Sequence, residues 1–450
     1  MSPKIIIVGA GPAGVRAAEV LANAGIQPVI LDEASRPGGQ VYRQPPRGAE
    51  RDPAKLYGTE ADKACAVHAT LDRLGDTVEY RAEALVWNCF DQKLNLLRRG
   101  VQEVLSFDRL IIATGTFDRI VPFPGWTLPG VFTLGGAQVA LKAQGVAIGR
   151  RIVLAGAGPL LPLVASQYLE AGADVVAILD VTPFWSKVKA LPRMMALPGM
   201  VSRGLSYLRS IRRFGMRTSY DVQALEALGE THVEGFKWQS GNGRWQEVGC
   251  DAVGASFGLK PETQLADLAG CQFYFDDFTR QWLPVVGEGG RSSVANVYLA
   301  GDCAAIGGAD VAELAGQRAA YAVLEDLKEN SHADDVRMID SELVRHARFR
   351  RGIESAYPFP KHLIDRIDDS LMICRCEGVS AGELRANFFK TGAPEVNRLK
   401  AFTRVGMGRC QGRVCGSVAA EILAQKRGTP VAETGRLRGQ HPIKPIPLVS

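Results

Sequence analysis

The sequence predicts an α/β protein with two dinucleotide-type folds, followed by a small helical domain that carries clustered cysteines. Residues 4–31 have the pattern of a strand, a glycine-rich turn, a helix and a second strand, which is one βαβ unit. The same order recurs over residues 151–179, so the chain contains an internal duplication. Four cysteines then gather between residues 374 and 415. These three observations determine the expected fold class.

The length and charge narrow the range of functions. At 450 residues, and with roughly 150 residues per domain as a prior, we expect about three domains. The net charge of +5 is small for this length and gives no support for nucleic-acid binding. No stretch approaches the roughly 18 apolar residues that a membrane span needs. The chain enters its first strand at once and leaves no room for a signal peptide, so we expect a cytoplasmic protein.

Turns and changes in composition indicate where the domains meet. A Pro/Gly-rich crossover at residues 126–131 is a natural hinge, and a strand at 297–300 followed by a long helix returns the chain to the first fold. The expected parts are the first nucleotide domain at 1–118 and 285–330, the second at 119–284 with a helical insertion at 183–216, a charged helical connector at 331–370, the cysteine domain at 371–430 and an extended tail at 431–450.

The first glycine-rich turn has the chemistry of a phosphate site. Gly9 permits the tight turn, Gly11 lets the backbone approach a pyrophosphate, and Gly14 lets the helix pack closely on the strand. Pro12 begins the helix without losing a hydrogen bond, and the free N–H groups of the helix start favour an anion. Asp32, at the end of the second strand, is placed to accept hydrogen bonds from an adenosine ribose.

The second turn repeats the first with one change. Gly156 and Gly158 remain, but Leu161 replaces the third glycine, which predicts a slightly wider packing of helix on strand. Asp180 closes the unit and favours a free ribose 2′-hydroxyl over a 2′-phosphate, hence NAD or another adenine nucleotide over NADP. A nucleotide that never reacts, or none at all, remains an alternative, because a fold does not fix a function.

The cysteines point to a metal or redox centre. Cys374 and Cys376 form one pair, and Cys410 and Cys415 form a second. Four thiolates hold either a 2Fe–2S cluster or a structural zinc ion. The chain has no Cys-x-x-Cys, which excludes a dithiol of the thioredoxin type as the outlet for electrons.

Several spaced motifs resemble those of flavoproteins with two dinucleotide domains, such as glutathione reductase and thioredoxin reductase. They are Gly38-Gly39-Gln40, Ala113-Thr114-Gly115 and the run from Tyr298 to Asp302. The resemblance implies FAD in the first fold, with Asp302 on the ribityl chain. The residues that we assign to the two nucleotide sites are Gly9, Gly11, Pro12, Ala13, Gly14, Asp32, Glu33, Gly39, Gln40, Arg43, Ala113, Thr114, Gly115, Gly301 and Asp302 in the first, and Gly156, Gly158 and Asp180 in the second.

The C-terminal domain resembles the cluster domain of bacterioferritin-associated ferredoxin, through its Cys-x-Cys-Glu start and the glycine-rich run over 406–415. This likeness implies a 2Fe–2S cluster on Cys374, Cys376, Cys410 and Cys415. The glycines around the second pair would leave backbone N–H groups free to bond the sulfurs, which raises the potential of a cluster.

The whole chain resembles the flavin subunit of heteromeric amino-acid and opine dehydrogenases, a group that includes opine oxidase, D-hydroxyproline dehydrogenase and, through its middle subunit, hydrogen cyanide synthase. The residues that carry this likeness are 38–43, 122–126 and 129–131, together with the insertion and the fused cysteine domain. The resemblance implies an electron-transfer subunit in a hetero-oligomer. It implies a D-amino-acid-oxidase-like FAD partner that oxidises the C–N bond, an FMN at their interface, a small ferredoxin-like subunit, and NAD or ATP in the second fold.

Two other functions remain open from the sequence. One is a self-sufficient NADH-dependent reductase of the ferredoxin type, whose cluster serves an external acceptor. The other is a non-catalytic scaffold in which the bound nucleotides only shape an assembly. No catalytic residue is assigned, because no substrate-binding set of histidines or arginines stands out.

Overall fold

The computed structural model describes residues 3–329 and 332–447. The ends of the expected terminal segments (1–2 and 448–450) and the domain junction at 330–331 lie outside the described residues. Of the helices in the described part of the chain, none has the length and apolar character to cross a bilayer.

The first nucleotide fold is built on a five-stranded parallel sheet. Alternate residues of β1 face opposite sides: Ile5 and Ile7 pack against helices, whereas Ile6 and Val8 pack against an antiparallel meander. The helices are α1 (Pro12–Asn23), α3 (Ala61–Leu74) and α9 (Ala309–Asp326), and α2 (Pro53–Tyr57) precedes α3. The sheet order is β20 (Val297–Leu299), β7 (Arg109–Ile112), β1 (Ile5–Val8), β2 (Val29–Leu31) and β3 (Glu79–Arg81), and the meander is β4 (Ala84–Phe90), β5 (Lys93–Arg98) and β6 (Val101–Ser106).

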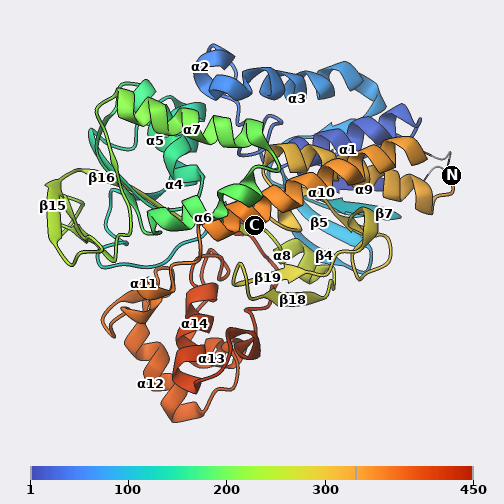
Figure 1. Ribbon diagram of the computed structural model, residues 1–450. Helices are drawn as coiled ribbons and strands as arrows, with labels where there is room; N and C mark the ends of the chain where they lie inside the picture. The colour runs from blue at the N-terminus through green and yellow to red at the C-terminus, as the bar shows by residue number, and fades with distance from the viewer. Residues whose placement is uncertain (1–2, 330–331, 448–450) are drawn as a thin grey trace.

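The second fold repeats this plan. Its parallel sheet has α4 (Leu134–Val139) and α5 (Leu160–Glu170) on one face and a second meander on the other. Figure 1 shows it in green beside the blue first fold. The sheet order is β12 (Thr218–Ser219), β11 (Asp174–Asp180), β10 (Arg151–Ala157), β16 (Ala252–Phe257) and β9 (Val131–Thr133), and the meander is β13 (Ala224–Leu228), β14 (Gly235–Gln239) and β15 (Trp245–Gly249).

A two-stranded antiparallel ribbon joins the two folds. It consists of β8 (Thr116–Asp118) and β17 (Leu259–Pro261), which pair Phe117 with Lys260. β8 follows directly on the Ala113-Thr114-Gly115 turn of the first fold, and α8 (Gln264–Leu268) follows β17. The ribbon therefore links the edge of the first nucleotide site to the second fold, since β17 follows directly on β16.

Helices from distant parts of the chain close over both folds. Residues 183–216 contain α6 (Phe184–Met194) and α7 (Pro198–Arg213), and the connector contains α10 (Ala333–Ala356) and α11 (Lys361–Asp365). α10 runs from α9 to α6 and crosses it closely at Gly352, where a Cβ would lie 2.7 Å from the side chain of Met194.

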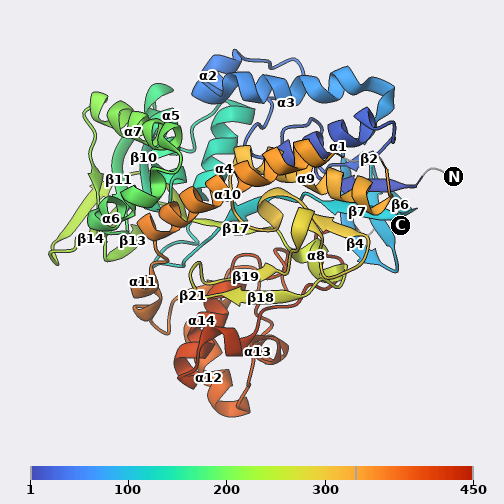
Figure 2. The same cartoon turned by 45° about the vertical axis from the view of Figure 1, so that its right-hand side comes forward.

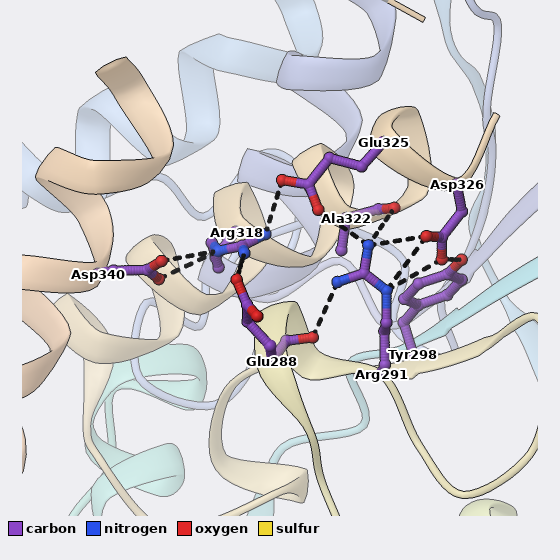
Figure 3. A network of polar contacts seen from close by, with 8 residues as sticks. All are labelled: Glu288, Arg291, Tyr298, Arg318, Ala322, Glu325, Asp326 and Asp340. Carbon is purple, nitrogen blue, oxygen red and sulfur yellow. Dashed lines mark hydrogen bonds and ion pairs between the residues drawn. The ribbon is translucent and has the colours of Figure 1, made fainter. Parts of the chain in front are cut away.

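A buried arginine fixes α10 to the first fold. Arg318 of α9 is only 2% exposed and pairs with Asp340 of α10 at 3.0 Å and with Glu288 at 3.1 Å (Figure 3). Arg291 pairs with Asp326 at the end of α9, at 2.8 Å. A buried charge is tolerated only when it is paired and hydrogen-bonded, so Arg318 has to keep its acidic partners. These contacts therefore hold α9, α10 and residues 288–291 together.

The cysteine domain packs beneath the two nucleotide folds (Figures 1 and 2). Its apolar core is continuous with that of the second fold, since Ile373 and Val418 belong to the same cluster as Val153. Its elements are β21 (Met372–Cys374), β22 (Val379–Ser380), α12 (Ala381–Thr391), α13 (Val396–Thr403), α14 (Gly416–Arg427) and η6 (Val431–Thr434), and the hairpin β18 (Phe273–Asp276) and β19 (Gln281–Pro284) lies beside it.

The tail after η6 returns to the first fold. Ile443 is 3% exposed and sits in the cluster beneath the first sheet, and its N–H donates to the carbonyl of Trp87 at 3.1 Å. An apolar residue buried in this way anchors a segment that has no helix of its own.

Candidate functional site

The first glycine turn has the geometry of an anion cradle. Gly9 has a φ of +110°, and a Cβ at this position would overlap the carbonyl of Ala113, so only glycine fits. Helix α1 begins at Pro12. Gly11 precedes it without a capping side chain, and no acidic residue stands in the first turn. The N–H groups and the positive end of the helix therefore remain available, and they fit a pyrophosphate.

A cavity of about 2240 Å³ opens at this turn and extends between the two folds to α6, α7 and α10. It exceeds the roughly 300–1,000 Å³ of an ordinary small-molecule pocket, so it has room for a dinucleotide. The predicted cofactor residues that line it are Gly9, Gly11, Pro12, Ala13, Asp32, Glu33, Gly39, Gln40, Arg43, Ala113, Thr114, Gly115, Gly158, Asp180 and Asp302.

Three predicted glycines do not line the cavity. A Cβ on Gly14 would overlap the carbonyl of Gly9, and a Cβ on Gly156 would overlap the carbonyl of Ser256. Gly301 has a φ of +76° and approaches the side chain of Ala13. These residues allow close backbone packing next to the cavity, and whether each takes part in cofactor binding stays a prediction.

The two acids after β2 have different surroundings. The carboxylate of Asp32 accepts hydrogen bonds from the backbone N–H groups of Ala10 and Ala34, the latter at 2.7 Å. Burial raises the pKa of Asp32, and these N–H groups oppose the rise. Glu33 is exposed and forms an ion pair with Lys444 of the tail. Asp32 thus holds the turn itself, and both carboxylates border the cavity where we predicted the ribose.

Two further predicted residues offer polar groups to the cavity. Arg43 lines the cavity, and its Nε is enclosed by protein without a hydrogen-bond partner among residues 3–329 and 332–447. Asp302 accepts hydrogen bonds from the N–H groups of Gly307 (2.8 Å) and Gly308 (3.0 Å), which orders the turn before α9. Together with the glycine cradle, these groups fit FAD, which supplies two-electron redox chemistry when bound.

The second fold keeps the turn but binds its acid internally. Gly158 has a φ of +107°, and a Cβ there would meet only backbone atoms of Gly258 at 3.6 Å or more, so this backbone is open to the cavity. Asp180 is 2% exposed, pairs with Lys187 at 3.0 Å, and accepts the N–H of Thr182 at 2.8 Å. Burial raises the pKa of Asp180, and the charge of Lys187 opposes the rise. The oxygens that would accept ribose hydroxyls are therefore already engaged.

Some cavity residues were not found from the sequence. Lys142 is 5% exposed, and its ammonium donates to the carbonyl of Val41 at 3.1 Å, beside the first site. Burial lowers the pKa of Lys142 to about 8. Arg203 of α7 forms an ion pair with Glu60, which ties the helical insertion to the first fold. No local pattern marks these residues, because each owes its position to a distant segment.

The four predicted cysteines come together, and Cys410 and Cys415 lie near Lys260 of β17. The thiol of Cys415 lies in hydrogen-bond contact with Cys374 and Cys410, and that of Cys376 contacts Cys410. A hydrogen bond from Cys415 lowers the pKa of Cys374 to about 6 and that of Cys410 to about 5. Cys374 and Cys415 are buried, whereas Cys376 is exposed.

The backbone around these thiols suits thiolates. The N–H of Gly406 bonds Cys374, and the N–H of Gly412 bonds Cys410, as the glycine-rich run predicts. Helix α14 begins directly after Cys415, so its positive end lies beside the sulfurs. In the described part of the chain, no three side chains form a closed ligand set for a single metal ion. The fit to a cluster therefore rests on the thiol contacts and these N–H groups.

The comparison with protein families identifies both parts of the chain. Residues 3–323 match the pyridine nucleotide-disulphide oxidoreductase family. The chain is a member of this family. Residues 372–425 match the BFD-like [2Fe-2S] binding domain. Membership implies FAD, and the second match implies a 2Fe–2S cluster in place of the alternative zinc ion.

Full-length relatives of this oxidoreductase combine the same parts. This chain is 34% identical to the A subunit of opine oxidase from Agrobacterium tumefaciens, over 99% of this chain and 90% of that protein. It is 33% identical to hydrogen cyanide synthase subunit HcnB of Pseudomonas aeruginosa, over 100% of this chain and 98% of that protein. The expected resemblance to the subunits of heteromeric dehydrogenases is thus confirmed.

Solved structures confirm the fold. L-proline dehydrogenase from P. horikoshii superposes with a TM-score of 0.70 at 19% identity, over 99% of this chain and 78% of that chain. Thioredoxin reductase from T. acidophilum gives a TM-score of 0.53 at 20% identity, over 73% of this chain and 99% of that chain. The predicted pair of dinucleotide folds with an added cluster domain is therefore confirmed.

Proposed function

We propose that this oxidoreductase is the FAD- and 2Fe–2S-containing electron-transfer subunit of a heteromeric dehydrogenase or oxidase that acts on the C–N bond of an amino acid or opine. The observation that carries the proposal is the position of the cysteine loop. Arg413, between Cys410 and Cys415, lines the same cavity as the glycine cradle of the first fold. A two-electron carrier beside a one-electron carrier is the arrangement that a relay needs.

The named relatives support the assignment to a larger enzyme, since they are subunits of opine oxidase and of hydrogen cyanide synthase. We infer a hetero-oligomer in which a D-amino-acid-oxidase-like FAD subunit oxidises the substrate. An FMN at the interface and a small ferredoxin-like subunit belong to the same proposal. The complex would act in the cytoplasm.

Within the chain, we propose that FAD lies in the domain formed by 1–118 and 285–330, held by the glycine cradle, the Ala113-Thr114-Gly115 turn and Asp302. The domain at 371–430 would hold the cluster on its four cysteines. The second domain (119–284) would hold an adenine nucleotide, NAD or ATP, with its phosphates at the open backbone of Gly158.

The test is co-purification of the chain with a D-amino-acid-oxidase-like protein encoded beside it. The purified complex is then screened against opines, hydroxyproline, proline and glycine with an artificial dye as acceptor. We expect the dye to be reduced with at least one substrate and only when both subunits are present. Failure of the two proteins to associate, or equal activity of the partner alone, would contradict the proposal.

The alternative NADH-dependent reductase has one observation in its favour, the open backbone at Gly158. It predicts that NADH alone bleaches the flavin absorbance of the isolated chain under anaerobic conditions. The scaffold alternative predicts that the flavin of the complete complex stays oxidised when substrate is added. We expect no bleaching in the first experiment and full reduction in the second.

A further inference from the structure

Among the ion pairs that join the cysteine domain and tail to the rest of the described molecule, three have both partners at most 25% exposed. All three are shielded from solvent, since the acid in each is between 4% and 13% exposed. They are Glu262–Arg413 at the cysteine loop, Arg280–Glu421 on α14 and Asp267–Arg436 in the tail.

Among these acids, Glu262 also bonds the predicted flavin turn. Its backbone N–H donates to the carbonyl of Gly115 at 2.9 Å, and its carbonyl accepts the hydroxyl of Thr114 at 2.7 Å. Its carboxylate accepts from Nε of Arg413. One residue at the end of β17 therefore touches the first nucleotide site through its backbone and the cysteine loop through its side chain.

Two further hydrogen bonds hold the cysteine loop close to the Glu262–Arg413 pair. The amide of Gln264 donates to the carbonyl of Gln411 at 2.7 Å. Arg413 Nη1 donates to the carbonyl of Ile443 in the tail at 2.8 Å. The loop between Cys410 and Cys415 is thus clamped between the end of β17 and the tail.

One guanidinium nitrogen of Arg413 is enclosed by protein and unpaired in the described part of the chain. Its Nη2 is buried and has no hydrogen-bond partner within residues 3–329 and 332–447, although the side chain lines the cofactor cavity. A buried guanidinium nitrogen is costly to leave unpaired, so the ion pair with Glu262 is needed to hold this side chain in its enclosed position.

We propose that Glu262 is a positioning residue that fixes the iron–sulfur loop against the flavin, and that electrons pass between the two cofactors across the Thr114–Glu262–Arg413 bridge. This inference rests on the proposed function. In one exchange the reduced flavin loses one electron, and one of the two ferric ions of the cluster becomes ferrous. No covalent bond forms or breaks in the polypeptide, and the flavin releases its proton to water.

The test compares Glu262→Gln with Glu421→Gln in the full-length, anaerobically purified holoprotein. Both variants remove a shielded carboxylate charge that joins the same domain, but only Glu262 bonds the flavin turn. The flavin is reduced by a laser flash with a deazaflavin as photochemical donor, and the flavin absorbance and the electron paramagnetic resonance of the reduced cluster are followed.

We expect Glu262→Gln to slow the exchange severalfold, because the cysteine loop loses the ion pair that holds it against the flavin turn. Its flavin content, iron content and dithionite-reduced spectrum should match the wild type. Glu421→Gln should exchange within about twofold of the wild type, because its backbone does not touch the flavin turn. The rate should not depend on protein concentration, since both cofactors lie in one chain.

Arg413→Lys is the second variant, because it keeps the cation but cannot fork between Glu262 and the tail. We expect an intermediate rate. Equal rates in the wild type and Glu262→Gln would overturn the bridge, and so would an equal slowing in both glutamate variants. A wild type that holds both cofactors but never passes an electron between them would instead contradict the proposed function itself.

Discussion

The two nucleotide folds share a turn and differ in what the turn leaves available. In both, the first glycine lies against a carbonyl of the neighbouring strand or its end, that of Ala113 for Gly9 and that of Ser256 for Gly156. In the first fold, Gly14 lets α1 pack directly on the turn. In the second, Leu161 fills this position and is buried among the apolar residues of α5.

The acids at the ends of β2 and β11 also differ in what they leave available to a ligand. Asp32 is held by backbone N–H groups, and Glu33 next to it remains at the cavity edge. Asp180 is held by a lysine side chain, and the next residue, Val181, is buried and apolar. The duplicated fold has thus kept the backbone of a phosphate site while satisfying its acid internally. A retained glycine motif therefore does not by itself indicate a second reactive nucleotide.

The largest expected effect comes from Gly14→Leu. A side chain there overlaps the carbonyl of Gly9, so the start of α1 must move away from the phosphates. Two hydrogen bonds to a charged group are worth roughly 1.5–3 kcal/mol each, so FAD affinity should fall by at least about 100-fold. The ratio of flavin absorbance to protein after gel filtration measures this. A variant that retains a full complement of flavin would show that α1 does not form the cradle.

The reciprocal change, Leu161→Gly, should act on stability and spare the flavin. It removes a side chain that is 1% exposed and leaves a cavity, which costs about 3–5 kcal/mol. We expect a lower midpoint in urea unfolding with an unchanged flavin-to-protein ratio. Loss of flavin at wild-type stability would break the distinction between the two folds.

Lys187→Met tests whether the acid of the second fold depends on its lysine. Removing one partner of a buried pair should cost about 3 kcal/mol, because Asp180 would be left as an unpaired buried carboxylate. The matched control is Lys444→Met, whose partner Glu33 is exposed, and it should cost under about 1 kcal/mol. Equal destabilisation in the two variants would mean that the acids are not held differently.

The smallest effect is a pH dependence at Lys142, which joins the second fold to Val41 of the first. The pKa of Lys142 is about 8 in the folded protein, whereas the ordinary pKa of a lysine is 10.5. Below pH 8 both states carry the proton. Above it the unfolded chain binds more protons, so stability rises with pH until about 10.5. The measurement is the free energy of unfolding of the apoprotein at pH 8 and at pH 9.5. The increase between these two pH values should be about 1–2 kcal/mol larger in the wild type than in Lys142→Met.

Local sequence patterns account for much of the fold. The glycine turns, the buried strands and the paired cysteines each lie within a few residues, where spacing alone limits the possible structures. The contacts that distinguish the two sites are long-range. Glu262 and Arg413 are 151 residues apart, and Ile443 reaches the first sheet from the far end of the chain. Arg413 stands between two cysteines and was within reach of a sequence argument, but Glu262 was not.

The Asp180–Lys187 pair could be predicted from the sequence only in part. The two residues are close in sequence, yet the lysine reaches the acid only because α6 turns back over the end of β11. The direction of that helix follows from its packing against α10, which no local pattern contains. Sequence reasoning could therefore place the acid at the second site but could not show that its charge was already paired.

The central claim is that the first fold holds the flavin that exchanges electrons with the cluster of the same chain. The most direct test is anaerobic photoreduction of the isolated wild-type holoprotein, followed by electron paramagnetic resonance at low temperature. We predict that bleaching of the flavin is accompanied by the signal of a reduced 2Fe–2S cluster, and that NADH produces neither change. A flavin that bleaches without any cluster signal, or a preparation that contains neither flavin nor iron, would contradict the claim.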